Sequence, residues 1–497
     1  MLRKIRIITA SVIMVLITAL LLDFTGILHH WLGWLAKVQF LPALLACNVV
    51  IVGALLLLTL IMGRIYCSVI CPLGIMQDVI SWFAGKRRKN RFTYSGEKRV
   101  LRLVMLGVMV VALISGAHVI VALLAPYSSY GRIVNSLLQP LYLWGNNLLA
   151  SIAAHYESYA FYGTDVWMKS VTVTAVAAIT LVVLGILAWR NGRTYCNTIC
   201  PVGTVLGYVA KFSLLKVRFD ADKCKSCSLC SRNCKASCID YKSHTVDYSR
   251  CVTCGDCLEK CNFGALHYGP ARKISGKKKD ATKAEATHDE VRRAVLMGGA
   301  IVAAGAVTAQ VNKKVDGGLA AIADKKEPKR STPLTPPGSH GARNMAAHCT
   351  ACQLCVAQCP NGVLRPSKGL KTLMQPTMNY DRGFCRPECT RCSEVCPTGA
   401  IRKIAPSEKS SLQIGHAVWV KENCLPAWNG TSCGNCARHC PSGAIMMVPL
   451  DENDENSPMV PVVNVERCTG CGSCEYVCPS RPFSAIYVEG HEQHRTI

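Results

Sequence analysis

The sequence lacks the motifs that carry most nucleotide and haem chemistry. It contains no C-x-x-C-H haem attachment motif, no G-x-G-x-x-G dinucleotide fingerprint and no Walker-type phosphate loop. Chemistry on nicotinamide cofactors or nucleoside triphosphates is therefore not indicated. Histidines in apolar segments, such as His29, His30 and His118, could ligate haem b, but no spacing rule pairs them.

Acidic residues are also scarce. The chain has 31 Asp and Glu against 56 Lys and Arg, which gives a formal net charge of +25. The basic residues lie in short loops beside apolar segments and in a linker, as in GKRRKNR at 85–91. No basic platform with interleaved aromatic residues accompanies them, so we interpret the charge as topology-setting and lipid-facing, and we expect no nucleic-acid partner.

Long apolar runs are present and lie mainly in the first 190 positions. Four of them, roughly 5–28, 40–63, 100–125 and 170–189, approach or exceed the ~20 residues that a helix needs to cross the hydrocarbon core. Basic residues precede the first run and flank the cytoplasm-facing ends of the others. The positive-inside rule therefore places both ends of this four-helix domain in the cytoplasm of a bacterial inner membrane.

The stretch 126–168 is expected on the opposite side of the membrane. It is rich in tyrosine and tryptophan, which usually form an interfacial belt. A quinone head-group pocket is the alternative interpretation, because quinones stack on aromatic rings and need one or two polar partners. His118 and His155 are the candidate proton acceptors for such a pocket.

A fifth apolar run, at 294–311, is predicted to be a later anchor. Arg292 and Arg293 precede it and resemble a twin-arginine export signal, although the flanking residues depart from the usual pattern. Basic residues on both sides of the run weaken the orientation argument. A Pro- and Lys-rich linker at 325–341 follows and is predicted to be extended rather than packed. These features predict that the last domain is periplasmic.

The chain has 30 cysteines, and nearly all of them occur in ferredoxin-type runs rather than in a disulfide framework. The first two runs are Cys224, Cys227, Cys230, Cys234 and Cys251, Cys254, Cys257, Cys261. In two-cluster ferredoxins the fourth cysteine of each run ligates the other cluster. We therefore expect one cluster on Cys224, Cys227 and Cys230 with Cys261 as its fourth ligand. The other cluster is expected on Cys251, Cys254 and Cys257 with Cys234, for which Cys238 is a possible substitute. Zinc is the less favoured metal here.

Four more runs lie in the last domain: Cys349, Cys352, Cys355, Cys359; Cys385, Cys389, Cys392, Cys396; Cys424, Cys433, Cys436, Cys440; and Cys468, Cys471, Cys474, Cys478. The second and third have a lengthened first step, yet all four end in C-x2-C-x3-C-P, which is typical of a cluster-binding loop. Six [4Fe–4S] clusters are predicted in total. We expect nested sharing, the first run with the fourth and the second with the third.

A duplicated motif marks the membrane half: GRIYCSVICPLG at 63–74 and GRTYCNTICPVG at 192–203. Cys67 and Cys71, like Cys196 and Cys200, are expected one helical turn apart on one face. Two pseudo-symmetric halves would then bring four thiols to one site, which we interpret as a metal or Fe–S site, a redox dithiol or a structural element. The adjacent Gly63, Arg64, Gly192 and Arg193 are expected in turns and at the lipid interface.

The predicted fold class is an α-helical membrane domain, with four spans plus one later anchor, joined to α+β bacterial-ferredoxin-like [4Fe–4S] domains. The expected boundaries are 1–211 for the four-helix membrane domain, 212–270 for a two-cluster module, 271–344 for the linker with its anchor, and 345–497 for a four-cluster domain. Fe–S clusters move single electrons with little rearrangement, so electron transfer is the indicated function.

The duplicated motif and the two-cluster module of residues 1–270 resemble the NapH family of membrane quinol dehydrogenase subunits. The remainder, with its CRPECTRCSEVCPTGA and CLPAWNGTSCGNCARHCPSGA segments, resembles the NapG/MauM ferredoxin-type proteins with four clusters. The resemblance implies a fusion that takes electrons from quinol and passes them toward a periplasmic reductase such as nitrate reductase, usually through a small cytochrome. The paired cysteine motif is also shared with NosR-type and oxidase-assembly ferredoxins.

Two hypotheses follow. The first is an electron conduit, the electron-transfer subunit of a quinol dehydrogenase. The alternative is a maturation or redox-maintenance factor that supplies electrons to a metalloenzyme. Rapid reduction by a quinol analogue would distinguish the conduit from the maturation factor.

Overall fold

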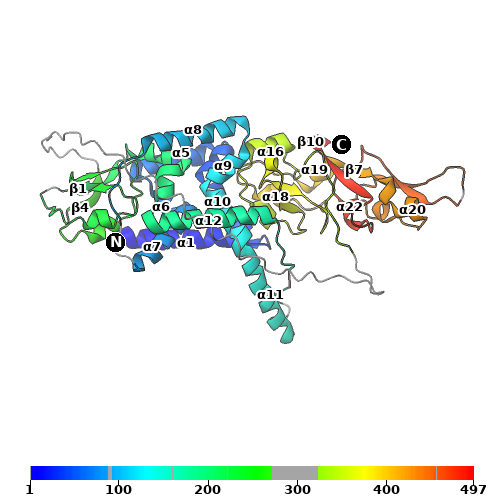
Figure 1. Cartoon of the computed structure of the whole chain (residues 1–497), viewed down its shortest axis with the longest axis horizontal. Coiled ribbons are helices and arrows are strands. Elements are labelled where there is room, and N and C mark those ends of the chain that lie inside the picture. Colours follow the sequence, from blue (N-terminus) through cyan, green and yellow to red (C-terminus); the bar gives the residue numbers. More distant parts are fainter. Residues whose placement is uncertain (1, 88–91, 159, 221, 271–322, 455) are drawn as a thin grey trace, which may run out of the picture. The chain divides into compact units, whose positions relative to one another are not determined.

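The structure is a computed structural model that describes residues 2–87, 92–158, 160–220, 222–270, 323–454 and 456–497. The predicted anchor at 294–311 and its twin arginines lie outside the described residues. Within the described part, Met1–Ala271 and Lys326–Ile497 belong to one compact unit. Figure 1 shows the course of the chain through it.

The first part is helical. Its helices are α1 (Leu2–Leu22), α2 (Ile27–Leu32), α3 (Trp34–Lys37), α4 (Phe40–Leu45), α5 (Val49–Met62), α6 (Ile65–Val69), α7 (Pro72–Arg87), α8 (Arg99–Ser115), α9 (His118–Leu124), α10 (Pro126–Ile133), η1 (Val134–Leu138, a π-helix), α11 (Gln139–His155), α12 (Val171–Asn191), η2 (Tyr195–Ile199, a π-helix) and α13 (Pro201–Ala210). α1 and α12 run alongside α7, and α10 packs against α7 and α12.

Two helices in the described part, α1 and α12, are long and apolar enough to cross a membrane. The other two predicted spans are each interrupted. α4 ends at Leu45 and α5 begins at Val49, where the side chain of Asn48 caps the new helix by accepting a hydrogen bond from Ile51 N. α8 ends at Ser115, and Gly116, which has a left-handed φ of 71°, follows it before α9 begins at His118. A continuous apolar segment in the sequence does not reveal such breaks, because only a few residues cause each of them.

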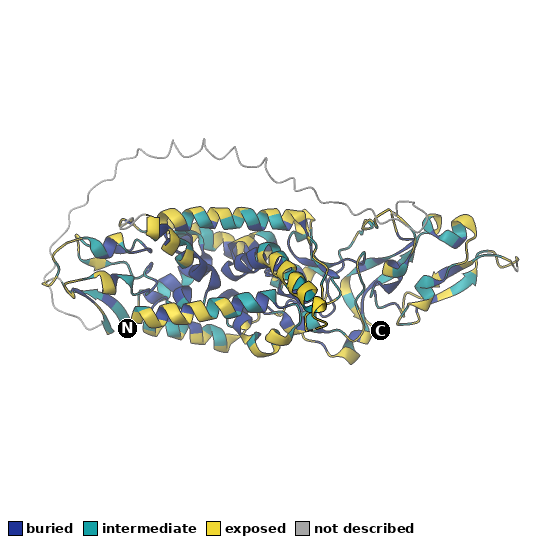
Figure 2. Ribbon diagram, turned by 90° about the horizontal axis from the view of Figure 1, so that it is seen from below, coloured by how far each residue is buried: buried dark blue, intermediate teal, exposed yellow. Residues whose placement is uncertain are grey.

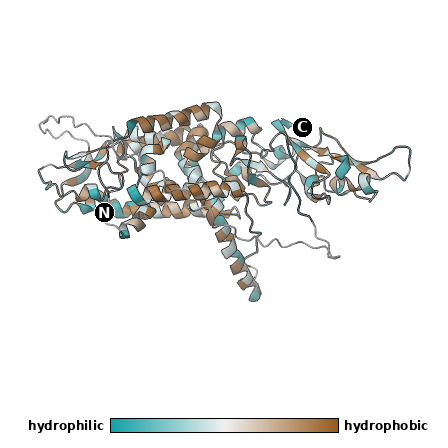
Figure 3. Cartoon of the chain, viewed as in Figure 1, coloured by the Kyte–Doolittle hydropathy of each residue, from teal (hydrophilic) through white to brown (hydrophobic). Residues whose placement is uncertain are grey.

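The outer faces of these helices are apolar and exposed. Large apolar side chains are exposed on α1, α5, α8 and α12, among them Val15, Val50, Val111 and Ile179. Figure 3 shows these helices coloured mainly as hydrophobic, and Figure 2 shows exposed residues along the outer faces of the helical part. A surface of this kind is not stable against water, so it indicates contact with lipid or with another apolar surface.

A small α+β module follows. It consists of β1 (Leu215–Phe219), α14 (Leu229–Arg232), β2 (Ile239–Asp240), β3 (Thr245–Val246), α15 (Asp256–Lys260) and β4 (Leu266–Pro270). β1 pairs antiparallel with β4 and β2 with β3. The module is joined to α5 by hydrogen bonds from Leu214 N to Leu60 O and from the Tyr268 hydroxyl to Met62 O.

The last part alternates short helices with two-stranded sheets. Its elements are α16 (Ala342–His348), α17 (Leu354–Ala357), β5 (Leu364–Pro366), η3 (Leu370–Thr372), β6 (Pro376–Met378), α18 (Arg391–Val395), α19 (Pro406–Ser410), β7 (Leu412–Trp419), η4 (Lys421–Asn423), α20 (Leu425–Asn429), α21 (Asn435–Arg438), β8 (Ile445–Pro449), β9 (Met459–Val463), α22 (Ser473–Val477) and β10 (Ile486–Thr496). The pairs β5–β6, β7–β10 and β8–β9 are antiparallel.

The linker prediction for 325–341 is wrong in one respect. The segment has no helix or strand, but residues 334–339 are buried. Arg330 donates to Val488 O and to the Glu475 carboxylate, which ties the segment to β10 and α22. Proline-rich composition predicts an extended backbone, and it does not predict whether a neighbouring sheet covers that backbone.

Candidate functional site: buried thiols between two ferredoxin-type modules

The duplicated motif brings four thiols together inside the helical part. Cys67 lies in α6 and Cys196 in η2, and each of the four cysteines, including Cys71 and Cys200, is 4% exposed. Electrostatic interactions link each thiol of one motif to thiols of the other. The predicted convergence of the two halves is thus confirmed as geometry.

The expected helical spacing within each motif is wrong. Cys71 follows α6 and precedes α7, and Cys200 is the N-cap of α13, where its sulfur accepts a hydrogen bond of 3.4 Å from Gly203 N. The second cysteine of each motif therefore stands at the start of a new helix, with the first on the preceding short helix. A proline after each second cysteine, Pro72 and Pro201, suits the first position of that helix.

The two motif arginines are not at a lipid interface. Arg64 and Arg193 are fully buried, and each reaches across to the other motif. Arg64 donates to Cys196 O at 3.1 Å and lies 3.7 Å from the Cys67 sulfur. Arg193 donates to Cys67 O at 2.5 Å. The prediction for these two residues is wrong because sequence position near a helix end does not reveal that a charge has partners inside.

Glycines permit this crossed arrangement. A Cβ on Gly74 would lie 2.3 Å from Cys67 O and 2.8 Å from Arg193 Nη1, and one on Gly203 would lie 2.2 Å from Cys196 O and 2.8 Å from Arg64 Nη2. The two motifs thus repeat the same contacts with exchanged partners. Gly63 and Gly192 have φ values of 76° and 66°, so their predicted role in turns is confirmed.

A carboxylate balances the charge of Arg193. Asp78 forms ion pairs with Arg193, Arg6 and Lys235 at 2.7, 2.8 and 3.2 Å. Burial opposes ionisation of this carboxyl, but the Arg193 and Lys235 charges hold the pKa of Asp78 well below its usual range. Lys235 also pairs with Asp256 at 3.0 Å, so this network extends from the four thiols into the two-cluster module.

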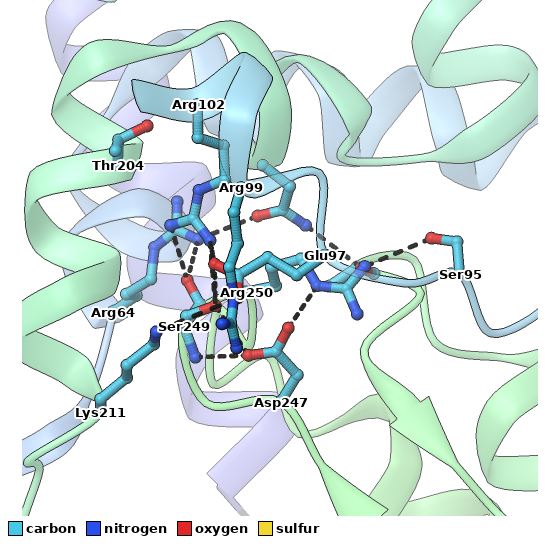
Figure 4. Close-up of polar contacts among 12 residues, drawn as sticks. Arg64, Ser95, Glu97, Arg99, Arg102, Thr204, Lys211, Asp247, Ser249 and Arg250 are labelled. Carbon is cyan, nitrogen blue, oxygen red and sulfur yellow. Dashed lines mark hydrogen bonds and ion pairs between the residues drawn. The ribbon is translucent and has the colours of Figure 1, made fainter. Parts of the chain in front are cut away.

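A second polar network joins the same regions (Figure 4). Arg64 donates to Ser249 O at 3.0 Å, and Arg102 donates to the Ser249 hydroxyl at 3.0 Å. Glu97 pairs with Arg102, and Asp247 accepts from Ser249 and from Arg250. Arg64 therefore lies between the Cys67 sulfur and the loop that leads into Cys251.

In the two-cluster module, one predicted set is brought together. Cys234 lies close enough to Cys251, Cys254 and Cys257 to interact electrostatically with each of these thiols, as the expected ligand set requires. Cys238 lies beside this set, with its sulfur 3.6 Å from that of Cys234. Cys224 and Cys227 both interact electrostatically with Cys230, so these three thiols also lie close together. The assignment of Cys261 as their fourth ligand stays a prediction.

The C-terminal runs are grouped differently from the nested expectation. Cys349, Cys352 and Cys355 lie near Cys396, while Cys385 and Cys392 lie near Cys359. In the same way Cys468 and Cys471 lie near Cys440, and Cys436 lies near Cys433, Cys424 and Cys478. The first run therefore exchanges its fourth cysteine with the second, and the third with the fourth. The nested prediction is wrong because consecutive runs fold as pairs.

The surroundings of these thiols suit [4Fe–4S] clusters. A backbone N–H donates to the sulfur of the last cysteine in four runs: Ala265 N to Cys261, Ile401 N to Cys396, Ala444 N to Cys440 and Ala485 N to Cys478, at 3.2 to 3.4 Å. Such hydrogen bonds stabilise thiolate ligands and tune cluster potential. Among the described residues no three Cys, His, Asp or Glu form a site for a single ion.

The first C-terminal thiol group approaches the helical part through α10. A Cβ on Gly131 would lie 2.5 Å from Cys352 O, and Asn135 donates to Gln353 O at 3.0 Å. Just before α10 in the chain, Leu124 O at the end of α9 accepts a hydrogen bond of 3.1 Å from the hydroxyl of Tyr195, the neighbour of Cys196. The four buried thiols consequently lie between the Cys251 loop and the Cys352 loop.

The aromatic stretch 126–168 divides into two. Tyr127 and Tyr130 are buried, at 2% and 3% exposure, so they do not belong to an interfacial belt. Tyr142, Trp144, Tyr156 and Tyr162 are exposed, and Figure 1 shows α11 extending away from the other helices. His118 is buried on α9 and His155 is at the end of α11.

Sequence reasoning missed the polar partners of the four thiols. Gln77 donates to the Cys196 sulfur at 3.3 Å, and Asp78 holds Arg193. A usable signal was present, because an arginine repeated at the same place in two apolar motifs is costly unless it is paired.

Comparison with known proteins supports an iron–sulfur assignment. The 4Fe-4S binding domain family matches residues 47–91 and 172–220, which contain the duplicated motif. Two 4Fe-4S dicluster domain families match residues 348–400 and 431–481, and residues 247–363. The first of these covers the C-terminal runs in the same consecutive pairs that the structure forms, except that Cys424 lies outside its second match. No solved structure matches the chain.

Curated relatives carry ferredoxin-type names. The ferredoxin-type protein NapH of Escherichia coli is 24% identical over 40% of this chain and 59% of its own length. The methylamine utilization ferredoxin-type protein MauN of Paracoccus denitrificans is 24% identical over 42% of this chain and 62% of its length, so the chain spans about three fifths of both proteins. MauM of the same organism is 34% identical over 32% of this chain and 73% of its length. The chain therefore belongs to the family of ferredoxin-type [4Fe–4S] proteins that includes MauM, and it is similar to the ferredoxin-type proteins NapH and MauN.

Proposed function

We propose that this chain is a membrane-bound conduit that takes electrons from quinol and passes them through [4Fe–4S] clusters toward a periplasmic reductase of the nitrate-reductase type. The observation that carries the proposal is the placement of four buried thiols between two ferredoxin-type modules. The Cys251 loop is reached through Arg64 on one side, and the Cys352 loop through Tyr195 and α10 on the other.

Six clusters are assigned to the six runs, with fourth ligands exchanged between neighbouring runs. The set of Cys67, Cys71, Cys196 and Cys200 is assigned as a seventh redox site. Four buried thiolates and a cubane carry net negative charge, and Arg64 and Arg193 supply two buried positive charges against it. A [4Fe–4S] cluster held there would supply one-electron transfer through the apolar part of the protein.

The membrane assignment rests on the exposed apolar faces of α1, α5, α8 and α12. The interrupted pairs α4–α5 and α8–α9 would complete the four spans. The two modules contact opposite ends of α1: Arg3 pairs with Asp256 at 2.8 Å, and Gln358 donates to Asp23 O at 2.6 Å. In this orientation the two-cluster module is cytoplasmic and the C-terminal domain periplasmic, where a small cytochrome or a reductase would accept the electrons.

Reduction by quinol tests the proposal. Protein purified anaerobically with its clusters loaded is mixed with a reduced menaquinol analogue, and cluster bleaching is followed by stopped-flow absorbance. A conduit reduces on the timescale of turnover, on the order of 1–1,000 s⁻¹. Clusters that accept electrons from dithionite but not from quinol would contradict the conduit and favour the maturation role.

A further inference from the structure

Two cavities meet at the end of α1 that faces the C-terminal domain. The first has a volume of about 700 Å³ and is lined mainly by apolar side chains of α1 and α7, such as Met14, Val15 and Val79. The second has a volume of about 610 Å³ and is lined by polar and aromatic side chains. Phe24 and Thr25 line both cavities, so the two are adjacent parts of one amphipathic space.

Phe24 stands at the junction among aromatic rings. Its ring centroid lies 6.3 Å from that of Tyr142, which lines the apolar cavity, and 5.8 Å from that of Tyr162, which lines the polar one. The polar cavity also contains Trp167. A flat aromatic head group suits such surroundings, because offset and edge-to-face ring contacts are favourable at these separations.

The polar cavity borders a predicted cluster ligand. Cys359 lines it, together with Lys169 and Arg386. The Lys169 ammonium group donates to Gln139 Oε1 at 2.9 Å and to Val356 O at 3.2 Å, which leaves one of its three protons for a further acceptor. Burial lowers the pKa of Lys169 to about 8, against the opposing charges of Cys359 and Cys355.

We propose that these joined cavities are the quinol site: the isoprenoid tail lies in the apolar cavity along α1, and the head group lies in the polar cavity, where Lys169 donates to a ring oxygen beside Cys359. The proposal rests on the proposed function and adds the place of binding. Oxidation of one quinol to quinone releases two electrons, which two [4Fe–4S] clusters accept singly, and two protons. The exposed carboxylate of Asp165 lines the same cavity and offers these protons a path to water.

A phospholipid would also place a tail in an apolar groove and a head group among basic residues. Quinol is favoured because the head-group cavity is lined by aromatic rings, which suit a flat ring, and because it borders a cluster ligand. Tyr476 and Phe384, whose centroids are 6.1 Å apart, also line it.

The test measures binding rather than turnover. The fluorescent quinol analogue 2-heptyl-4-hydroxyquinoline N-oxide is titrated into the cluster-loaded full chain in detergent. Loss of a hydrogen bond from a charged donor is expected to weaken binding about tenfold in Lys169→Gln. Lys421→Gln, which changes an exposed lysine of η4 that lines neither cavity, should bind as the wild type does.

A matched pair of substitutions on α1 tests whether the tail of the ligand lies in the apolar cavity. Val15 and Val12 are both exposed on α1, at 65% and 51%, but only Val15 lines the apolar cavity. Val15→Phe should weaken binding of the heptyl probe and leave binding of the tailless 4-hydroxyquinoline N-oxide unchanged. Val12→Phe should change the binding of neither probe.

The outcomes separate the site from the function. If quinol reduces the clusters while Lys169→Gln and Val15→Phe bind the probe normally, the site is wrong and the conduit stands. If the wild type neither binds the probe nor is reduced by quinol, the conduit fails as well. Displacement of the probe by phosphatidylglycerol, without displacement by a menaquinone analogue, would identify a lipid site and overturn the assignment.

Discussion

At the scale of single residues, the unexpected feature is a pair of buried arginines beside buried thiols. Arg64 and Arg193 are fully enclosed, yet each has partners from the opposite motif and Arg193 has a carboxylate. A buried charge without partners would cost several kcal/mol. The two arginines therefore belong to the thiol site and link the two halves of the duplicated motif.

Replacing one of the four thiols should remove one cluster. We expect Cys196→Ser to lower the content by ~4 iron atoms per chain, because a cubane needs four ligands and serine is a poor substitute. Iron and acid-labile sulfide per chain measure the loss. Cys47→Ser is the matched control, since Cys47 is exposed and outside every run. Equal iron in Cys196→Ser and wild type would mean that the four thiols hold no cluster.

Cys234 and Cys238 compete for one ligand position. A hydrogen bond from Cys238 lowers the pKa of the Cys234 thiol, so Cys234 is the better thiolate. Cys234→Ser is expected to lose the electron paramagnetic resonance signal of its cluster, and Cys238→Ser to keep the signal with a shifted reduction potential. The reverse pattern would assign Cys238 as the ligand.

At the scale of elements, the start of α7 depends on a glycine. A Cβ on Gly74 meets backbone at 2.3 Å, whereas one on Gly85 of the same helix meets nothing within 4 Å. Gly74→Ala is expected to destabilise the protein by about 1–3 kcal/mol through overpacking. Gly85→Ala should be neutral or stabilising by up to about 1 kcal/mol, because alanine favours helix. Thermal unfolding in detergent, followed by circular dichroism, measures both. A Gly74→Ala protein as stable as wild type would refute the close approach.

The pairing of the C-terminal runs can be tested by double substitution. If Cys349 and Cys396 serve one cluster, then Cys349→Ser, Cys396→Ser and the double variant should each lose the same ~4 iron atoms. Combining Cys349→Ser with Cys478→Ser, the pair that nested sharing would place together, should lose ~8. If the Cys349/Cys396 double variant instead lost ~8 iron atoms and the Cys349/Cys478 double variant only ~4, the nested arrangement would be supported.

At the scale of the whole molecule, the central question is the side of the membrane on which each module lies. Alkaline phosphatase folds only in the periplasm, so a fusion at residue 497 should be active and a fusion at residue 270 inactive. Green fluorescent protein at the same two positions should give the opposite result. Two inactive phosphatase fusions with bright fluorescence would place both modules in the cytoplasm and exclude a periplasmic acceptor.

Much of this protein could be predicted from local sequence. Cysteine runs followed by proline specify cluster-binding loops because ligand spacing is a property of consecutive residues, and the family matches agree. The duplicated motif predicted that four thiols converge, since two copies of one unit tend to pack symmetrically. Apolar length and basic flanks indicated the helical part, although the breaks at Asn48 and Gly116 depend on single residues.

Which thiols lie together could be read only from the folded chain. The proximity of Cys396 to the first run, the burial of Arg64 and Arg193, and the packed segment 334–339 all depend on contacts between residues far apart in the chain. Such contacts are selected by the fit of whole elements and not by local spacing. Local spacing therefore indicates the kind of cofactor that the cysteine loops can hold, because ligand spacing is set by neighbouring residues, while the fold sets which loops meet in space.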